Sequence, residues 1–249
     1  ENIQKRWNEL KRDVSKVTMP DTTAMSAKEK AFPALAAGEM KPYTASYNQT
    51  IKAGSRSMQM GMTRKIQSGQ LEGQKVWLIT SRSESPRGTT TDTIYLAKEN
   101  LLPVKRLVKQ PQMNVTLDFK EQKITGTMQV RGRNQDVSIN KDNKVLAMPE
   151  VVARVMDLNG QFEAGFHMLN LMQQKIQKYS MEVKGNQKVK VPSGSFDCYK
   201  IKLSSSEGGT PTQTLFFTRE KPHHLVKAIN ELPANMGGVT VISELKTLE

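Results

Sequence analysis

The chain of 249 residues contains only one cysteine, Cys198, and no run of 18 apolar residues. One cysteine cannot form an intrachain disulfide, and without such an apolar run no transmembrane helix is expected. Aromatic residues make up only 6% of the sequence and do not follow the pattern of RNA-recognition strands. Because Cys198 lies inside an expected strand with no local motif for a nucleophile, we interpret it as a buried structural thiol.

Motifs of the common enzyme classes are also missing from the sequence. It has no Gly-x-Ser-x-Gly, no His-Glu-x-x-His, no Walker loop and no dinucleotide fingerprint, and its carboxylates are scattered. The pair His223-His224 is a poor metal clamp, because adjacent residues of a strand point to opposite faces. We therefore expect a protein that is not an enzyme, with no catalytic residues, no metal site and no cofactor.

Positive charge dominates, since 37 Lys and Arg residues against 24 Asp and Glu residues give a formal net charge of +13. Such a balance suits an acidic partner, such as nucleic acid or anionic lipid headgroups. The basic residues are nevertheless spread along the chain, and their longest contiguous run is two, as at Lys5-Arg6. We interpret them as the wet face of a sheet, and we do not expect nucleic acid as a partner.

The stretch from Val183 to Leu203 carries the clearest structural signal, which predicts strand, turn, strand, tight turn, strand. Apolar and polar side chains alternate along it, as in an antiparallel sheet with one buried and one wet face. The alternation sets Val189 and Val191 against Lys188 and Lys190, and Tyr199, Ile201 and Leu203 against Cys198, Lys200 and Lys202.

Similar patterns predict strands over most of the chain from Tyr43 onward, with short turns between them. The predicted strands span about 43–53, 56–66, 74–84, 89–97, 103–109, 113–120, 123–131, 134–140, 176–185, 187–191, 196–204, 212–218, 224–230 and 238–246.

Helical patterns occur at the N-terminus and in the middle of the chain. An apolar stripe predicts an amphipathic helix over about residues 2–17, packed on the sheet or bound to a membrane surface or partner. The stripe consists of Ile3, Trp7, Leu10, Val14 and Val17. A second, short helix is expected over residues 24–31. Pro149 begins another short helix, and the apolar stretch that continues to Met172 is either a second helical turn or an irregular crossover.

One phrase in the second half of the chain follows a family pattern. Val189 to Lys200 reads V-x-V-P-x-G-x-F-x-x-x-K, and Gly194 suits its tight turn because such a turn needs a positive φ. The aromatic strand Thr214–Phe217 and the closing strand Leu225–Lys227 follow, and the segment from Tyr95 to Phe119 adds to the pattern. Together these segments resemble an uncharacterised family of exported bacterial proteins, the domain of unknown function 3108, over about residues 43–245.

The resemblance implies a large, strongly curved antiparallel sheet, like the half-barrel of bacterial lipoprotein carriers, whose concave face wraps helices or an apolar ligand. We therefore expect a mainly β fold with a curved, open or half-barrel sheet that wraps helices, and an N-terminal amphipathic helix. Residues 1–42 would form that helix and a covering segment, and residues 43–249 one β domain with a helical insertion near 149–172.

The resemblance also implies export to the periplasm or cell envelope, and it brings no catalytic residues. The chain begins at Glu1 rather than at Met, which favours a mature protein whose leader was removed. The expected function is non-catalytic binding of a lipid or another apolar small molecule. The alternative is an envelope scaffold that binds a protein partner and fills its cavity with its own helices.

Three methionines give the ligand hypothesis its first residues. Met58, Met60 and Met62 would share one face of a strand, about 6 to 7 Å apart. They could pack in the core, line an adaptable apolar cavity or bind Cu(I) through their thioethers. The residues that we expect to line the cavity are Met58, Met60, Met62, Trp77, Ile79, Phe166 and Phe217.

Overall fold

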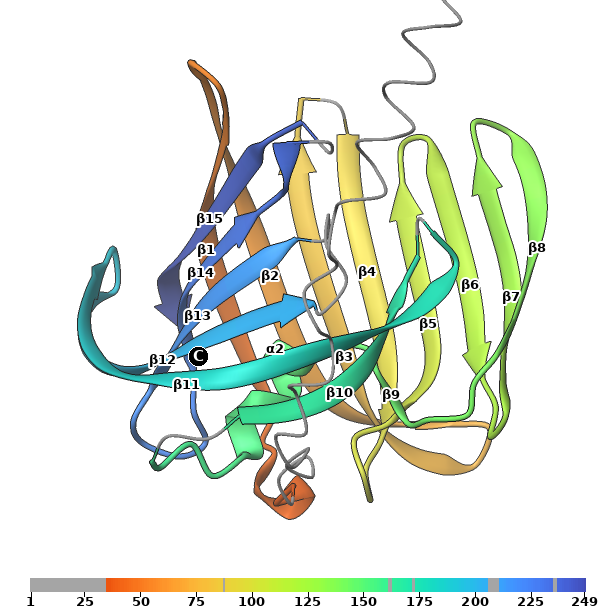
Figure 1. The fold of residues 1–249 in the computed structure, drawn as a ribbon, viewed down its shortest axis with the longest axis horizontal. Coiled ribbons are helices and arrows are strands. Elements are labelled where there is room, and N and C mark those ends of the chain that lie inside the picture. The colour runs from red at the N-terminus through yellow and green to blue at the C-terminus, as the bar shows by residue number, and fades with distance from the viewer. Residues whose placement is uncertain (1–34, 87, 161–162, 172, 206–210, 235–236) are drawn as a thin grey trace, which may run out of the picture. The chain divides into compact units, whose positions relative to one another are not determined.

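Figure 1 shows the computed structural model, which describes residues 35–86, 88–160, 163–171, 173–205, 211–234 and 237–249. The chain divides into two compact units, residues 1–30 and residues 31–249, and all described residues belong to the second unit. The helices predicted over residues 2–17 and 24–31 therefore lie outside the described residues. In the described ranges, no helix is both long and apolar enough to cross a membrane.

The second unit is built on one sheet of 15 strands. Strands β1 to β8 follow one another as a meander, strands β10 to β15 do the same with β9 beside β10, and β1 pairs with β15 to join the two halves. Neighbouring strands are antiparallel except for β9 and β10, which are parallel. The first half comprises β1 (Tyr43–Ala53), β2 (Arg56–Leu71), β3 (Gln74–Ser85), β4 (Gly88–Ala97), β5 (Pro103–Gln110), β6 (Met113–Phe119), β7 (Lys123–Val130) and β8 (Arg133–Asn140). The second half comprises β9 (Val145–Leu146), β10 (Glu163–Asn170), β11 (Lys175–Val191), β12 (Gly194–Ser205), β13 (Thr212–Thr218), β14 (Leu225–Glu231) and β15 (Val239–Leu248).

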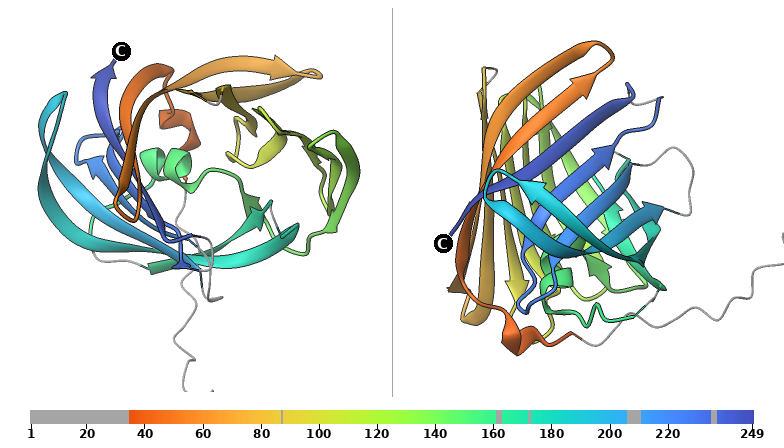
Figure 2. Two further views of the ribbon diagram at one scale, coloured as in Figure 1. Left: turned by 90° about the horizontal axis from the view of Figure 1, so that it is seen from above. Right: turned by 90° about the vertical axis from the view of Figure 1, so that its left-hand side faces the viewer.

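The sheet curls strongly but does not close into a barrel, because the edge strands β8 and β9 share no ladder in the described chain (Figure 2). Side chains bridge the two halves of the sheet instead. Val145 of β9 and Leu169 of β10 pack in one hydrophobic cluster with Leu117 of β6 and Val137 of β8. The expected curved, open antiparallel sheet is thus confirmed.

A short segment lies inside the curve of the sheet (Figure 2), and we call Met148–Leu158 the plug segment. It contains the helix α2 (Pro149–Val152) and the 3-10 turn η2 (Ala153–Val155). Pro149 suits the first turn of a helix because the missing N–H would have no helical partner there. Most of its apolar side chains are fully buried in the main core: Val151, Val152, Ala153, Val155, Met156 and Leu158. The concave face that contacts the plug segment is called the inner face below.

The helical content differs from the expectation. The insertion predicted near 149–172 is helical only up to Val155, and Glu163–Asn170 forms strand β10. The second part is a strand because Ala164 and Phe166 alternate with less buried neighbours. Besides α2, the described residues contain only the single-turn 3-10 helices η1 (Ala37–Glu39) and η2, so a set of wrapped helices is not supported.

The hairpin of β11 and β12 is longer than predicted. The chain does not turn between two strands near Gly185; a bulge at that glycine lets β11 run on to Val191. Gly194 has a φ of 135°, as the tight turn requires. Beside it, Ser193 donates both its backbone N–H and its hydroxyl to the carbonyl of Leu245, at 3.1 and 3.0 Å, which ties the hairpin tip to β15.

Candidate ligand-binding cavity

The three methionines of β2 lie on the inner face together with Arg64 and Ile66. Burial increases along this row, since Met58 is 39% exposed, Met60 and Met62 are half-buried, and Ile66 is 1% exposed. Met62 packs against the main core, and its sulfur accepts from the Gln49 amide at 3.5 Å. This row of inner-face side chains is therefore exposed at Met58 and becomes buried toward Ile66, which packs in the same core as the plug segment.

The other predicted lining residues lie in two different places. Trp77, Ile79 and Phe217 are buried in the main core, in the cluster that includes the plug segment. Phe166 of β10 also belongs to that core, but it lines a cavity as well. The structure therefore does not bring the seven predicted residues together around one space.

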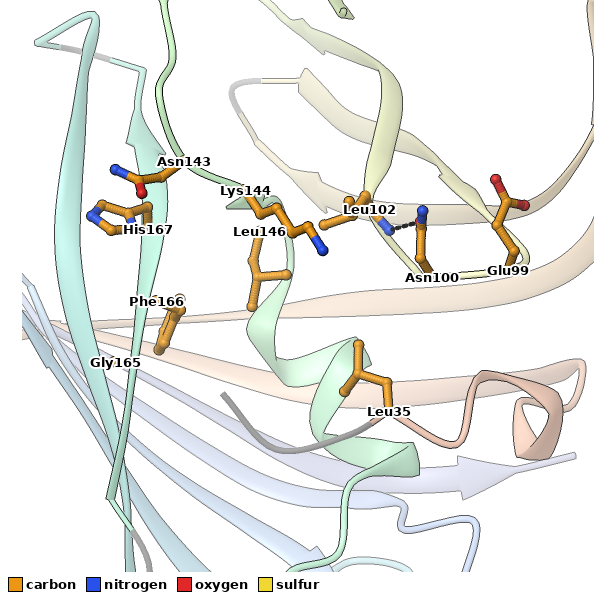
Figure 3. Close-up of a pocket in the computed structure, with 10 residues that line it drawn as sticks. All are labelled: Leu35, Glu99, Asn100, Leu102, Asn143, Lys144, Leu146, Gly165, Phe166 and His167. Carbon is orange, nitrogen blue, oxygen red and sulfur yellow. Dashed lines mark hydrogen bonds between the residues drawn. The ribbon is translucent and has the colours of Figure 1, made fainter. Parts of the chain in front are cut away.

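The cavity beside Phe166 has a volume of about 550 Å³ (Figure 3). Four chain segments converge on it: residue 35, the β4–β5 loop, the approach to β9, and β10. The described lining residues are Leu35, Glu99, Asn100, Leu102, Asn143, Lys144, Leu146, Gly165, Phe166 and His167.

Apolar and polar side chains both line this cavity. Leu35, Leu102, Leu146 and Phe166 supply the large apolar surfaces (Figure 3). The backbone N–H of Leu102 donates to Oδ1 of Asn100 at 2.9 Å, which fixes the loop that presents the leucine. A volume of this size with apolar walls and a few polar groups is typical of small-molecule sites.

A cluster of charges lies between β2 and the plug segment. Arg64 donates to the hydroxyl of Ser81 at 3.1 Å and to the Glu150 carboxylate at 3.2 Å. Burial acts most strongly on Arg64 and opposes its charged form, but Glu150 together with Tyr43, Tyr47 and Asp92 outweighs burial and raises the pKa of the guanidinium. This ion pair joins the sheet to α2 on the inner face.

Arg154 is the most unusual side chain of the plug segment. It is 1% exposed, and none of its three side-chain nitrogens has a hydrogen-bond partner in the described structure. Its guanidinium carbon lies 3.7 Å from the centre of the Tyr43 ring, a cation–π contact. Burial lowers the pKa of Arg154, because water no longer solvates the charge.

Two histidines pack beside this arginine and are uncharged at neutral pH. Burial, followed by the charge of Arg154, lowers the pKa of His224 to about 4. Burial also lowers the pKa of His223, whose Nδ1 lies 2.8 Å from the carbonyl oxygen of Thr218. The histidines carry no negative charge that could balance the charge of Arg154. Glu150 is paired with Arg64, so the positive charge of Arg154 has no negative partner among the described residues.

Sequence reasoning predicted only Phe166 among the residues of this cavity, and it missed the charged cluster. Glu150 and Arg154 stand at i and i+4, which favours an ion pair along one helix face. The structure pairs Glu150 with Arg64 of β2 instead, a partner 86 residues away in sequence. Only the long-range packing of the plug segment could have revealed this.

The single cysteine offers a test of the packing on β12. Cys198 is fully buried, as predicted, and burial raises the pKa of its thiol to about 11. The thiolate is the reactive form, and at pH 8 roughly one thiol in a thousand would carry that charge. We expect a thiol reagent such as dithiobis(nitrobenzoate) to label the native protein on the order of 100-fold more slowly than the urea-unfolded protein. Rapid stoichiometric labelling of the native protein would contradict this burial.

The metal-ligating residue types do not gather in the parts that the structure describes. Among these residues, no group of three or more His, Cys, Asp or Glu side chains is placed to hold an ion. His223 and His224 contact Tyr199 and Tyr43 edge-on, with ring centres 5.5 and 5.8 Å apart. Packing against these two tyrosine rings therefore accounts for the positions of His223 and His224.

The comparison with protein families decides where the chain belongs. Residues 42–241 match the family described as protein of unknown function (DUF3108). The chain belongs to this family. The resemblance inferred from the phrase at Val189 to Lys200 is thereby confirmed. No curated protein matches the sequence.

Two crystal structures are similar to this chain. One is a beta-barrel-like protein of the domain of unknown function DUF1849 from Brucella abortus, with a TM-score of 0.54 and 8% identity. The match covers 84% of this chain and 97% of that chain. The other is a DUF1329 family protein from Desulfovibrio piger, with a TM-score of 0.32 and 10% identity over 86% of this chain and 87% of that chain. The similarity to the first structure supports the β-barrel-like fold, whereas the TM-score of the second is too low to support a conclusion.

Proposed function

We propose that this protein binds a lipid-like or other apolar small molecule without transforming it. The observation that carries the proposal is the cavity of about 550 Å³ with Leu35, Leu102, Leu146 and Phe166 in its walls. Apolar walls of this kind favour a ligand with apolar surface, because burial of that surface contributes about 25 cal/mol of binding free energy per Å².

The architecture supports a binding role. The sheet that surrounds the cavity is fixed by long ladders, whereas the cavity walls come from loops and strand ends. Such a rigid scaffold with variable loops is a common basis for binding sites. The one thiol, Cys198, is buried on β12 and does not line the cavity. We further propose a location in the periplasm or cell envelope, an expectation that rests on the family resemblance.

A second candidate function rests on the plug segment. Its buried apolar side chains fill part of the concave space, as a scaffold with a self-filled interior would require. In that case the protein would act through an envelope protein partner rather than a small ligand. The two proposals differ in whether the cavity beside Phe166 accepts a molecule.

Filling the cavity should abolish ligand binding. In Leu102→Trp, the larger ring would occupy the space that the leucine now lines, so a fluorescent fatty-acid probe should bind at least about tenfold more weakly. The matched control is Leu107→Trp. Leu107 lies on the outer face of strand β5, which follows the loop of Leu102, and it does not line the cavity. Fluorescence titration of the wild type and both variants, each checked for folding by circular dichroism, measures the effect.

The titration discriminates between the two candidate functions. Saturable binding to the wild type and to Leu107→Trp, with loss in Leu102→Trp, supports the ligand cavity. Equal binding to all three proteins, or no binding to the wild type, would rule out this cavity as the site and leave the scaffold proposal.

A further inference from the structure

One lysine lines the cavity, and two more line a hollow next to it. Lys144 lines the cavity and also an adjacent open hollow of about 800 Å³. The hollow is formed by the β6–β7 turn and the segment between β8 and β9: Glu121, Gln122, Lys123, Asn140, Lys141, Asp142, Asn143 and Lys144. The backbone N–H of Lys141 donates to the carbonyl of Gln122 at 2.9 Å, which holds these two segments side by side. Three lysines thus face one continuous polar surface next to the apolar walls.

The ammonium group of Lys144 is available to a ligand. Lys144 is exposed and forms no ion pair with another described residue, and the same is true of Lys123. The side chain of Lys144 points toward Leu102 in the view of Figure 3, and both residues line the cavity. Glu99, the one carboxylate among the described lining residues, instead accepts from the Gln74 amide at 3.1 Å.

The polar and apolar groups of the cavity therefore differ in exposure. Lys144 and Asn143 are exposed and offer hydrogen-bond donors, while Leu146 and Phe166 are buried and offer apolar contact. Lysine binds carboxylate and phosphate groups as a compact point charge with three donors. The carboxylates of Glu121 and Asp142 share the hollow, but the three lysines outnumber them.

We propose that the ligand is an anionic amphiphile, whose carboxylate or phosphate head lies against Lys144 while its apolar chain occupies the cavity. This inference rests on the proposed function, because it specifies the head group of the same ligand. The head group stays near water, where Lys123 and Lys141 add attraction at longer range. The hydrocarbon chain supplies most of the affinity, and the charge selects the ligand.

The experiment compares head groups on one chain length. The probes are oleate, oleyl phosphate, oleyl alcohol and inorganic phosphate, each used below its micelle concentration in competition with a fluorescent fatty-acid probe. The variant is Lys144→Met, which removes the charge and keeps an apolar stem. The control is Lys190→Met, a change at an exposed lysine on β11 outside the cavity.

For the wild type we expect oleate or oleyl phosphate to bind roughly five- to tenfold more tightly than oleyl alcohol. Lys144→Met should remove this preference, whereas Lys190→Met should keep it. Raising the salt concentration should weaken binding of the anions only. Inorganic phosphate alone should not displace the probe, since it lacks the chain.

Each contrary outcome has a distinct meaning. Equal binding of the alcohol and the anions, with no effect of Lys144→Met, would contradict the proposal of an anionic head group but not the proposal of an apolar ligand in the cavity. Displacement of the probe by inorganic phosphate would show a site for a free anion and overturn the amphiphile. Failure of every oleyl compound to bind would overturn the proposed function and this inference with it.

Discussion

Gly126→Ala should unfold part of the sheet or lower its stability sharply. Gly126 of β7 has a φ of 156°, and a Cβ atom placed there would lie 1.9 Å from the backbone carbonyl oxygen of Thr116 on β6. No side-chain rotation can relieve a clash with backbone, so the β6–β7 ladder must shift. Strain of this kind costs 1 kcal/mol or more, and we expect a loss of about 3 kcal/mol in the free energy of unfolding. For a chain of this size the melting temperature should fall by roughly 6 to 12 °C.

The matched control for this substitution is Gly61→Ala on β2. An added Cβ there meets nothing within 4 Å, and its φ lies outside the positive range. Alanine should therefore be neutral or slightly stabilising at that position. Urea unfolding followed by circular dichroism compares the two variants with the wild type. If Gly126→Ala melts within about 1 °C of Gly61→Ala, the close approach of β6 and β7 is not as described.

Arg154→Met should make the protein more stable, although it removes a core side chain. The guanidinium is buried without a hydrogen-bond partner among the described residues, and replacing such a charge with an apolar side chain of similar length is often stabilising. The cation–π contact with Tyr43 offsets part of the gain. We expect the free energy of unfolding to rise by about 1 to 2 kcal/mol in urea titrations.

Arg64→Met is the matched control, because the same chemical change should have the opposite sign. Arg64 is paired with Glu150, and its loss would leave that carboxylate without its partner at the plug segment. We expect a decrease of about 2 to 3 kcal/mol, since one member of a partly buried pair is costly to remove. A decrease of the same size in both variants would mean that Arg154 is stabilised as well as Arg64 and that its charge is balanced.

Most of the strand positions could be predicted from local sequence patterns. Strands β1 and β13 were expected with the same bounds, because β-branched and aromatic residues are frequent in them and turn residues flank them. The pairing of β1 with β15 was not predicted. It joins residues such as Ala45 and Leu248, some 200 residues apart, and no local pattern encodes such a ladder.

The functional residues were predicted less well than the strands. Period-two spacing placed Met58, Met60 and Met62 on one face, and the structure agrees. It could not show that Trp77 and Ile79 would be buried in the same core as the plug segment. The cavity also needs Leu102, Lys144 and Phe166 from three separate segments, and Leu35 from a fourth. Their convergence depends on how strongly the sheet curls, which no single segment determines.

The central claim is that the cavity beside Phe166 holds an apolar molecule. Native mass spectrometry of gently purified wild-type protein, with solvent extraction of anything bound, tests it most directly, and Leu102→Trp prepared in parallel is the comparison. The account predicts added mass on the wild type, recovered as a lipid in the extract, and a bare mass for Leu102→Trp. A bare mass for the wild type, unchanged after incubation with envelope lipids, would contradict the account and favour a protein partner.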